Sequence, residues 1–165
     1  MEEKELLKLS PKELIDLGVC PTCLNRKYHG AIYGDDTDKR LYRDEDIEIL
    51  FVGNPRAAGH LAILSVSHYR DMAEAPDELN AKIVRYAKYL MNLLPEVYGC
   101  ERVYLCTMCD GPANHYHVQL IPRYKGEERG SRNFVKPRGE FVSDPVRTER
   151  LRAALKAFAR DGSSE

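Results

Sequence analysis

The chain has 165 residues, which is long enough for one domain with a self-sufficient hydrophobic core. Its 25 Lys and Arg residues nearly balance 26 Asp and Glu residues, which excludes a general nucleic-acid-binding protein. No apolar stretch is long enough to cross a bilayer and the first eight residues are acidic, so we expect a cytoplasmic protein without a membrane partner. Five cysteines, in two Cys-x-x-Cys pairs plus Cys100, indicate metal-binding or core thiols rather than disulfides in a reducing compartment.

The first 19 residues are expected to form an N-terminal helical arm. Ser10-Pro11-Lys12-Glu13 has the form of a capping box with proline at the first helical position, and Gly18 ends the short helix. This helix leads into Cys20-Pro21-Thr22-Cys23. Residues 24–38 are polar and contain glycine, so no regular element is predicted there.

Three short strands and one long helix are predicted next. The strands are expected at residues 40–43, 47–51 and 61–66. Apolar residues recur at helical spacing from about Pro76 to Leu94, which predicts a core-facing helix that Pro95 should end.

Residues 102–108 and 115–124 are predicted to form two antiparallel neighbouring strands joined by a turn. A basic loop over residues 125–138 and a last helix should follow. That helix has Asp144 as its cap and Pro145 at its first position, and its expected inward residues are Val146, Leu151, Leu155 and Phe158. Helices among mostly antiparallel strands predict a single α+β domain over residues 1–165, with residues 125–165 as its basic loop and C-terminal helix.

His115-Tyr116-His117-Val118-Gln119 is the most informative run of the chain. Strand alternation would place His115, His117 and Gln119 on one face and apolar residues on the other. A neutral imidazole can bind a metal or attack an electrophile, so one strand face could supply both functions. Polar surface or a structural metal clip is the alternative interpretation of the same pattern.

Cys20 and Cys23 flank a turn that suits two thiolates on one tetrahedral zinc, which needs two further ligands. Two pairs of residues could complete this site: His68 and His115, or Cys106 and Cys109. Cys106 lies inside a predicted strand and fits a core thiol at least as well. The absence of any metal is the third alternative.

If His115 binds zinc, His117 is free to attack a phosphorus atom, provided that its other ring nitrogen donates to a carbonyl. A structural role is the alternative for His117. Phosphoryl transfer also needs positive charge and donors around the transferred oxygens. The candidate substrate-binding residues are Asn54, His60, Asn114, Arg123 and Lys125.

Together these residues resemble the histidine-triad (HIT) superfamily of nucleotide hydrolases and transferases. Residues 54–60 resemble its Pro-x-x-x-Gly-His segment, and Ser67-His68 resembles its following histidine. Residues 115–123 resemble the triad strand with its trailing Pro-Arg. The resemblance spans about residues 18 to 125, and it implies a HIT-like α+β domain that forms a homodimer.

Gln119 stands where the family has a third histidine, which is similar to the galactose-1-phosphate uridylyltransferase branch and to dinucleoside-polyphosphate phosphorylases. This branch implies a covalent nucleotidyl intermediate on His117, with Gln119 holding a phosphate oxygen. It also implies a structural zinc on Cys20, Cys23, His68 and His115. Alternatives are a simple HIT-type nucleotide hydrolase and a zinc-stabilised nucleotide-binding module without catalysis.

Two departures from the family pattern concern substrate binding. The segment Gly111-Pro112-Ala113-Asn114 is short and lacks the serine that usually contacts the phosphates, so Asn114 and the 125–138 loop are expected to replace it. Val52 stands where the family usually has an acidic or amide residue for the ribose.

Overall fold

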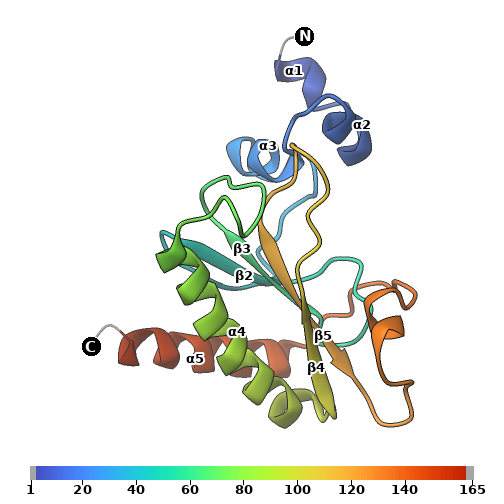
Figure 1. Cartoon of the computed structure of the whole chain (residues 1–165), viewed down its shortest axis with the longest axis vertical. Coiled ribbons are helices and arrows are strands. Elements are labelled where there is room, and N and C mark those ends of the chain that lie inside the picture. The colour runs from blue at the N-terminus through green and yellow to red at the C-terminus, as the bar shows by residue number, and fades with distance from the viewer. Residues whose placement is uncertain (1–2, 163–165) are drawn as a thin grey trace.

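The computed structural model describes residues 3–162, and its centre is a five-stranded antiparallel sheet with the order β1-β2-β3-β5-β4 (Figure 1). The strands are β1 (Arg40–Arg43), β2 (Ile47–Phe51), β3 (Leu61–Ser65), β4 (Arg102–Cys106) and β5 (His117–Arg123). The helices are α1 (Glu3–Leu6), α2 (Pro11–Asp16), α3 (Pro21–Lys27), α4 (Asp77–Tyr98), η1 (Ser131–Phe134) and α5 (Pro145–Asp161). The predicted α+β class, with an antiparallel sheet, one long helix and a C-terminal helix, is therefore confirmed.

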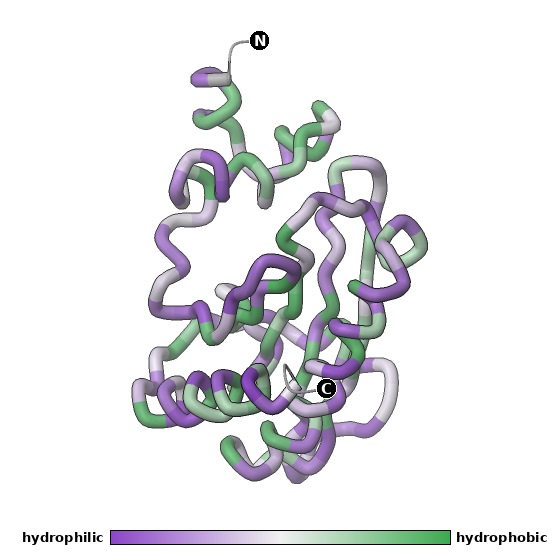
Figure 2. Tube along the Cα trace, turned by 90° about the vertical axis from the view of Figure 1, so that its left-hand side faces the viewer, coloured by the Kyte–Doolittle hydropathy of each residue, from purple (hydrophilic) through white to green (hydrophobic). Residues whose placement is uncertain are grey.

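One face of the sheet is apolar and packs on α4 and α5. Ile49, Ile63 and Val118 are paired across β2, β3 and β5, and all three are buried. Leu90 of α4 and Leu151 of α5 belong to the same core. Along the helices, hydrophobic and hydrophilic residues alternate, as expected of elements with one buried side (Figure 2).

The opposite face of the sheet carries polar side chains. Its central row is Glu48, Leu64 and His117, which are paired across β2, β3 and β5. Because side chains alternate along a strand, the residues that build the core on one face place these side chains on the other. The sheet therefore separates the hydrophobic core from the face that bears the candidate site.

The N-terminal arm begins as predicted. The Ser10 hydroxyl accepts a hydrogen bond from the Glu13 N–H, and the Glu13 carboxylate accepts one from the Ser10 N–H, which completes the capping box of α2. The helix α3 was not predicted, because its seven residues carry no helical apolar period. It forms with Cys20 as its N-cap and Pro21 at its first position.

The prediction that Pro95 ends the long helix is wrong, because α4 continues to Tyr98. A proline in the last turn removes only one backbone donor, which is a small loss beside the packing of the buried Leu94 and Val97. The helix ends at Gly99, whose φ of 71° is left-handed and whose N–H donates to the Pro95 carbonyl.

Two further predictions are corrected. The histidine strand begins at His117 rather than at residue 115, because Tyr116 bonds instead to Tyr69 and Ser65, outside the regular ladder. Val146 of α5 is 80 % exposed and does not point inward, whereas Thr148 is buried.

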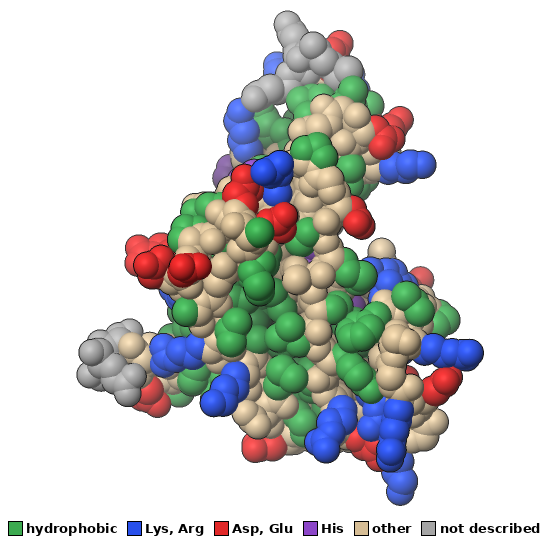
Figure 3. Space-filling model, in the orientation of Figure 1, with side chains coloured by type: hydrophobic (Ala, Val, Ile, Leu, Met, Phe, Trp, Pro, Cys, Tyr) green, Lys and Arg blue, Asp and Glu red, His purple; other side chains and the backbone are tan. Residues whose placement is uncertain are grey.

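Lys and Arg side chains gather over the segment between β5 and α5, where the basic loop was predicted (Figure 3). This segment contains the short helix η1. Within residues 3–162, no helix combines the length and apolar composition needed to cross a membrane.

Candidate functional site

Two cysteines and two histidines from three separate parts of the chain meet beside the sheet. Cys20 and Cys23 come from the start of α3, His68 follows β3, and His115 precedes β5. Their potential ligand atoms all lie within 4.8 Å of one another. Within the described residues, this is the only such group of three or more metal-ligating side chains.

The spacing of these atoms fits a tetrahedral metal site. The Cys20 Sγ lies 3.5 Å from the His115 Nδ1, and the Cys23 Sγ lies 3.4 Å from both this atom and the His68 Nδ1. Zn–S and Zn–N bonds of usual length in a tetrahedron separate sulfur and nitrogen by about 3.6 Å. The four side chains could thus hold a zinc ion with little rearrangement.

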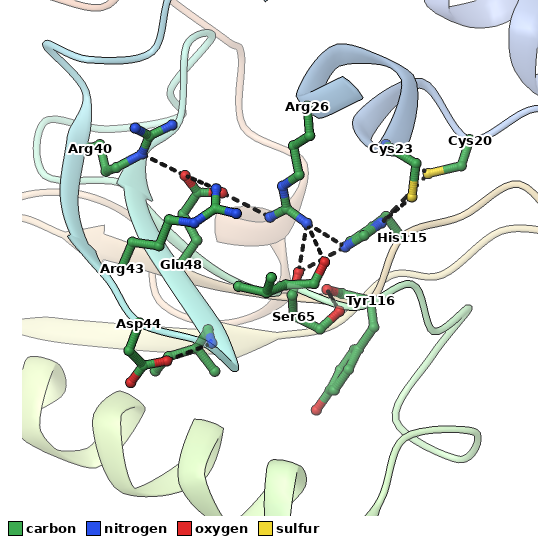
Figure 4. A network of polar contacts seen from close by, with 12 residues as sticks. Cys20, Cys23, Arg26, Arg40, Arg43, Asp44, Glu48, Ser65, His115 and Tyr116 are labelled. Carbon is green, nitrogen blue, oxygen red and sulfur yellow. Dashed lines mark hydrogen bonds and ion pairs between the residues drawn. The ribbon is translucent and has the colours of Figure 1, made fainter. Parts of the chain in front are cut away.

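The second ring nitrogen of His115 is oriented by the backbone. Its Nε2 lies 2.8 Å from the Ser65 carbonyl and donates to it, which leaves the Nδ1 lone pair directed at the thiols (Figure 4). Arg26 donates to the same carbonyl at 2.9 Å and to that of Val66 at 2.8 Å. The guanidinium of Arg26 therefore lies beside His115 because both groups donate to Ser65.

The two thiols of the cluster titrate together. The hydrogen bond from the Cys23 thiol lowers the pKa of Cys20, and the same contact raises the pKa of Cys23. One thiolate therefore forms readily, and the positive charge of a bound cation would favour loss of the second proton.

A chain of hydrogen bonds fixes the tautomers of two further histidines. The Arg56 backbone N–H can only donate, and it does so to the His60 Nδ1 at 3.0 Å. The His60 Nε2 must then carry the proton and donate to the Gln119 Oε1, also at 3.0 Å. The Gln119 Nε2 consequently faces the His117 Nε2 at 3.4 Å as a donor, while the His117 Nδ1 donates to the His115 carbonyl at 2.8 Å. These hydrogen bonds favour the His117 tautomer that carries its proton on Nδ1 and accepts a hydrogen bond at Nε2.

His60 is 1 % exposed, and burial lowers its pKa from 6.5 to about 4. As the pH falls from about 6.5, the unfolded chain binds this proton before the folded chain does. We therefore expect His60 to reduce the free energy of unfolding by roughly 2 to 3 kcal/mol between pH 6.5 and 4, with no further loss below pH 4.

Denaturant titrations at several pH values check this prediction. Because the cysteine and histidine cluster also responds to acid, the quantity to compare is the difference between the protein and the His60→Gln variant. A pH dependence that is unchanged in His60→Gln would show that His60 does not contribute.

The polar face of the sheet forms the floor of a cleft of about 990 Å³, walled by α3 and the segment that follows it. Among the predicted site residues, His117, His115, Asn54 and Asn114 line this cleft. His60 and Gln119 are buried behind His117, and both amide atoms of Gln119 face histidines. That Gln119 also holds a phosphate oxygen stays a prediction.

The structure places Arg123 and Lys125 away from the cleft, and their contact with substrate stays a prediction that the cleft does not support. Arg123 is buried at the far end of β5, about 20 Å along the strand from His117. It forms an ion pair of 2.8 Å with Glu101. Lys125 lies beyond it in the following turn and is exposed.

The second cysteine pair takes no part in the cluster. Cys106 belongs to β4 and is paired with Gln119, and burial raises the pKa of its thiol. The Cys109 Sγ lies 3.4 Å from the Thr107 hydroxyl. The all-thiolate alternative is therefore excluded, and the mixed set of thiols and imidazoles is the one that the fold brings together.

A network of arginines around Glu48 was not predicted from the sequence (Figure 4). Its carboxylate contacts Arg26 at 2.8 Å, Arg40 at 2.6 Å and Arg43 at 3.4 Å. Burial raises the pKa of Glu48, but Arg26 and Arg40 outweigh this effect and the pKa is lowered overall. Glu48 is therefore a buried anion, and the network forms one wall of the cleft.

Comparison with known proteins identifies the fold. No protein-family model matches the chain. The chain is 27 % identical over 100 residues to an uncharacterised HIT-like protein of Methanocaldococcus jannaschii, covering 58 % of this chain and 77 % of that protein. It is similar to the crystal structure of a zinc-bound histidine triad family protein from Mycobacterium smegmatis, with a TM-score of 0.53, 22 % identity and coverage of 76 % of this chain and 87 % of that chain.

A third similar structure is the Plasmodium falciparum diadenosine triphosphate hydrolase in complex with cyclomarin A. Its TM-score is 0.56 at 12 % identity, over 78 % of this chain and 82 % of that chain. The fold is therefore that of the histidine-triad proteins, and the chain is HIT-like, as the sequence predicted. The finer resemblance to the uridylyltransferase and phosphorylase branch stays a prediction.

Proposed function

We propose that the protein is a nucleotidyltransferase or phosphorylase that acts at the α-phosphate of a nucleotide substrate through a covalent intermediate on His117. The observation that carries this proposal is the fixed tautomer of His117. Its Nδ1 donates to the His115 carbonyl, which leaves Nε2 without a proton. His117 lines the cleft. A neutral imidazole so fixed is a nucleophile that needs no prior deprotonation, although its Nε2 must first give up the hydrogen bond of 3.4 Å from the Gln119 amide.

In the first step, the His117 Nε2 attacks the α-phosphorus, a P–N bond forms and the P–O bond to the leaving group breaks. The leaving group departs with the electron pair of that bond. The ring becomes positively charged, and the His115 carbonyl at 2.8 Å stabilises the proton that stays on Nδ1. In the second step, phosphate or another phosphorylated acceptor attacks the phosphorus and releases the nucleotide from His117.

Gln119 limits which leaving groups are suitable. Its amide cannot act as a general acid, so the leaving group must depart without a proton from this residue. A phosphate-type leaving group meets this condition, whereas an amine does not. Dinucleoside polyphosphates and nucleotide sugars are therefore the substrates that we propose.

We further propose that Cys20, Cys23, His68 and His115 hold a structural zinc ion. The tetrahedral spacing of their ligand atoms and the hydrogen bond from His115 to Ser65 support this assignment. When bound, the ion would tie α3 to the segments that flank β3 and β5. Its four protein ligands would leave no open position, so it would not take part in the reaction itself.

Product analysis with and without inorganic phosphate tests the proposed reaction. Attack by phosphate on a nucleotidyl-histidine gives a nucleoside diphosphate, whereas attack by water gives a monophosphate. With a dinucleoside tetraphosphate, whose leaving group is a nucleoside triphosphate, we expect the diphosphate to appear only when phosphate is added. Monophosphate alone under both conditions would favour the hydrolase alternative, to which the diadenosine triphosphate hydrolase neighbour lends support. No turnover of any nucleotide by the zinc-loaded protein would favour the non-catalytic module, the alternative suggested by Val52.

Three expectations from the sequence stay proposals: a single domain over residues 1–165, a cytoplasmic location and a homodimer. The nucleotide or nucleotide conjugate remains the proposed binding partner.

A further inference from the structure

The arginine network lies in line with His117 across the sheet. Arg43 pairs with Glu48, Glu48 with Leu64, and Leu64 with His117. Directly paired residues present their side chains on the same face of a sheet. Neighbouring strands lie about 4.8 Å apart, so Glu48 is about 10 Å from His117 along this row.

A β-bulge brings a second arginine onto the same face. Arg40 pairs with Leu50, whereas Tyr42 pairs with Ile49, so the register shifts by one residue between Arg40 and Tyr42. Regular alternation would place Arg40 and Arg43, three residues apart, on opposite faces. The bulge reverses this outcome, and both guanidinium groups meet the carboxylate of Glu48.

The charges of this network do not balance. Glu48 has a side chain that is 5 % exposed and supplies one negative charge to three guanidinium groups. Arg26 alone gives it a charged partner at 2.8 Å, and Arg26 is also held by the carbonyls of Ser65 and Val66. A purely structural ion pair would need no more than this. Arg40 also interacts at longer range with Asp35 and Asp36. The cleft nevertheless carries five Lys and Arg side chains against three acidic ones, so a positive excess remains.

Arg40 and Arg43 also keep donors free for a ligand. Among the described residues, each guanidinium makes a single hydrogen bond, and both bonds go to the same Glu48 oxygen, Oε1. A guanidinium carries five N–H donors, so most of theirs are available. The two side chains are 41 % and 38 % exposed, and both line the cleft that contains His117.

We propose that Arg40 and Arg43, oriented by Glu48, form a subsite for a second phosphate-type anion of the ligand that reacts at His117. Guanidinium groups bind phosphate oxygens through paired N–H donors, which suits this arrangement. The inference rests on the proposed function for the first anion at His117. The subsite narrows the substrate class to nucleotides that carry a further phosphate group about 10 Å from the reacting phosphate.

Calorimetric titration with inorganic tripolyphosphate, and separately with inorganic phosphate, tests the subsite at constant ionic strength. We expect Arg40→Gln and Arg43→Gln to weaken the binding of tripolyphosphate about tenfold or more. Arg102→Gln serves as the matched control, because Arg102 is an exposed arginine at the far end of the sheet, paired with Arg123. If the variants lose affinity for tripolyphosphate but not for phosphate, the second anion belongs to a phosphate chain that continues from the first. If the variants lose affinity for both anions, the second anion is a separate phosphate group.

Equal affinity in Arg40→Gln, Arg43→Gln and Arg102→Gln for both anions would overturn the proposal and leave the network a structural one. Arg40→Lys guards against a folding artefact, because it keeps the charge and loses the planar fork; we expect intermediate binding of tripolyphosphate. The assay requires no turnover. A missing adduct on His117 would therefore count against the proposed function alone, and unchanged anion binding would count against the subsite alone.

Discussion

Replacing His117 by alanine is expected to reduce turnover of a dinucleoside polyphosphate by about a thousandfold or more, because the attacking atom is removed. The variant should remain folded, since His117 is only partly buried and its side chain contacts the His115 carbonyl and Gln119. Steady-state kinetics together with the unfolding midpoint check both statements.

Two companion variants sharpen this prediction. Cys109→Ala, which alters a thiol on the neighbouring loop, should retain turnover. His117→Gly should regain part of its activity when imidazole is added, because free imidazole can occupy the vacated position and supply the same nucleophile. Full activity in His117→Ala would rule out a covalent role for this residue.

Replacing Cys20 by serine is expected to abolish stoichiometric zinc binding and to lower the free energy of unfolding by about 3 kcal/mol or more. Serine is itself a strong N-cap, so the start of α3 should not be weakened by the loss of the sulfur as a cap. The loss would therefore report on the metal link between α3 and His115. Metal analysis and thermal unfolding provide the measurements.

Cys106→Ser is the matched control for the metal site. It removes a partly buried thiol that lies outside the cluster, so bound zinc should be unchanged and stability nearly so. A chelator should lower the unfolding midpoint of the unaltered protein but not that of Cys20→Ser. Zinc retained in Cys20→Ser and lost in Cys106→Ser would contradict the assignment.

The strands were well predicted because their signal is local. Residues 47–51 and 117–123 are short, mainly apolar runs, a signal that depends only on neighbours in the chain, and nearly all of their residues are buried, on both faces of the sheet. The end of α4 was mispredicted because tertiary packing around Leu94 and Val97 outweighs the local effect of Pro95.

The candidate site likewise contains residues that the sequence predicts and residues whose position depends on the fold. The thiol and imidazole cluster joins residues 95 positions apart in the sequence. The spacing of the cysteines and histidines left two possible ligand sets, and the family resemblance selected one of them. In the fold, His68 and His115 lie beside the thiols of Cys20 and Cys23. Arg123 and Lys125 lie away from the cleft although they are close to His117 in sequence, because each residue of an extended strand adds about 3.3 Å of distance.

The arginine network could not be predicted from the sequence because it depends on an irregularity. Glu48 reads as a polar residue on the exposed side of a strand, and a spacing of three between Arg40 and Arg43 argues against a shared face. Only the bulge in β1 and the cover of α3 make Glu48 a buried anion with three cationic partners.

The most direct test of the account is to trap the intermediate. The protein is incubated with a labelled dinucleoside polyphosphate or nucleotide sugar, quenched under conditions that preserve phosphoramidates, and the modified peptide is located by mass spectrometry. The account predicts an acid-labile nucleotidyl group on His117, present in Cys109→Ala and absent from His117→Ala. An adduct of the same mass that persists in His117→Ala would contradict it.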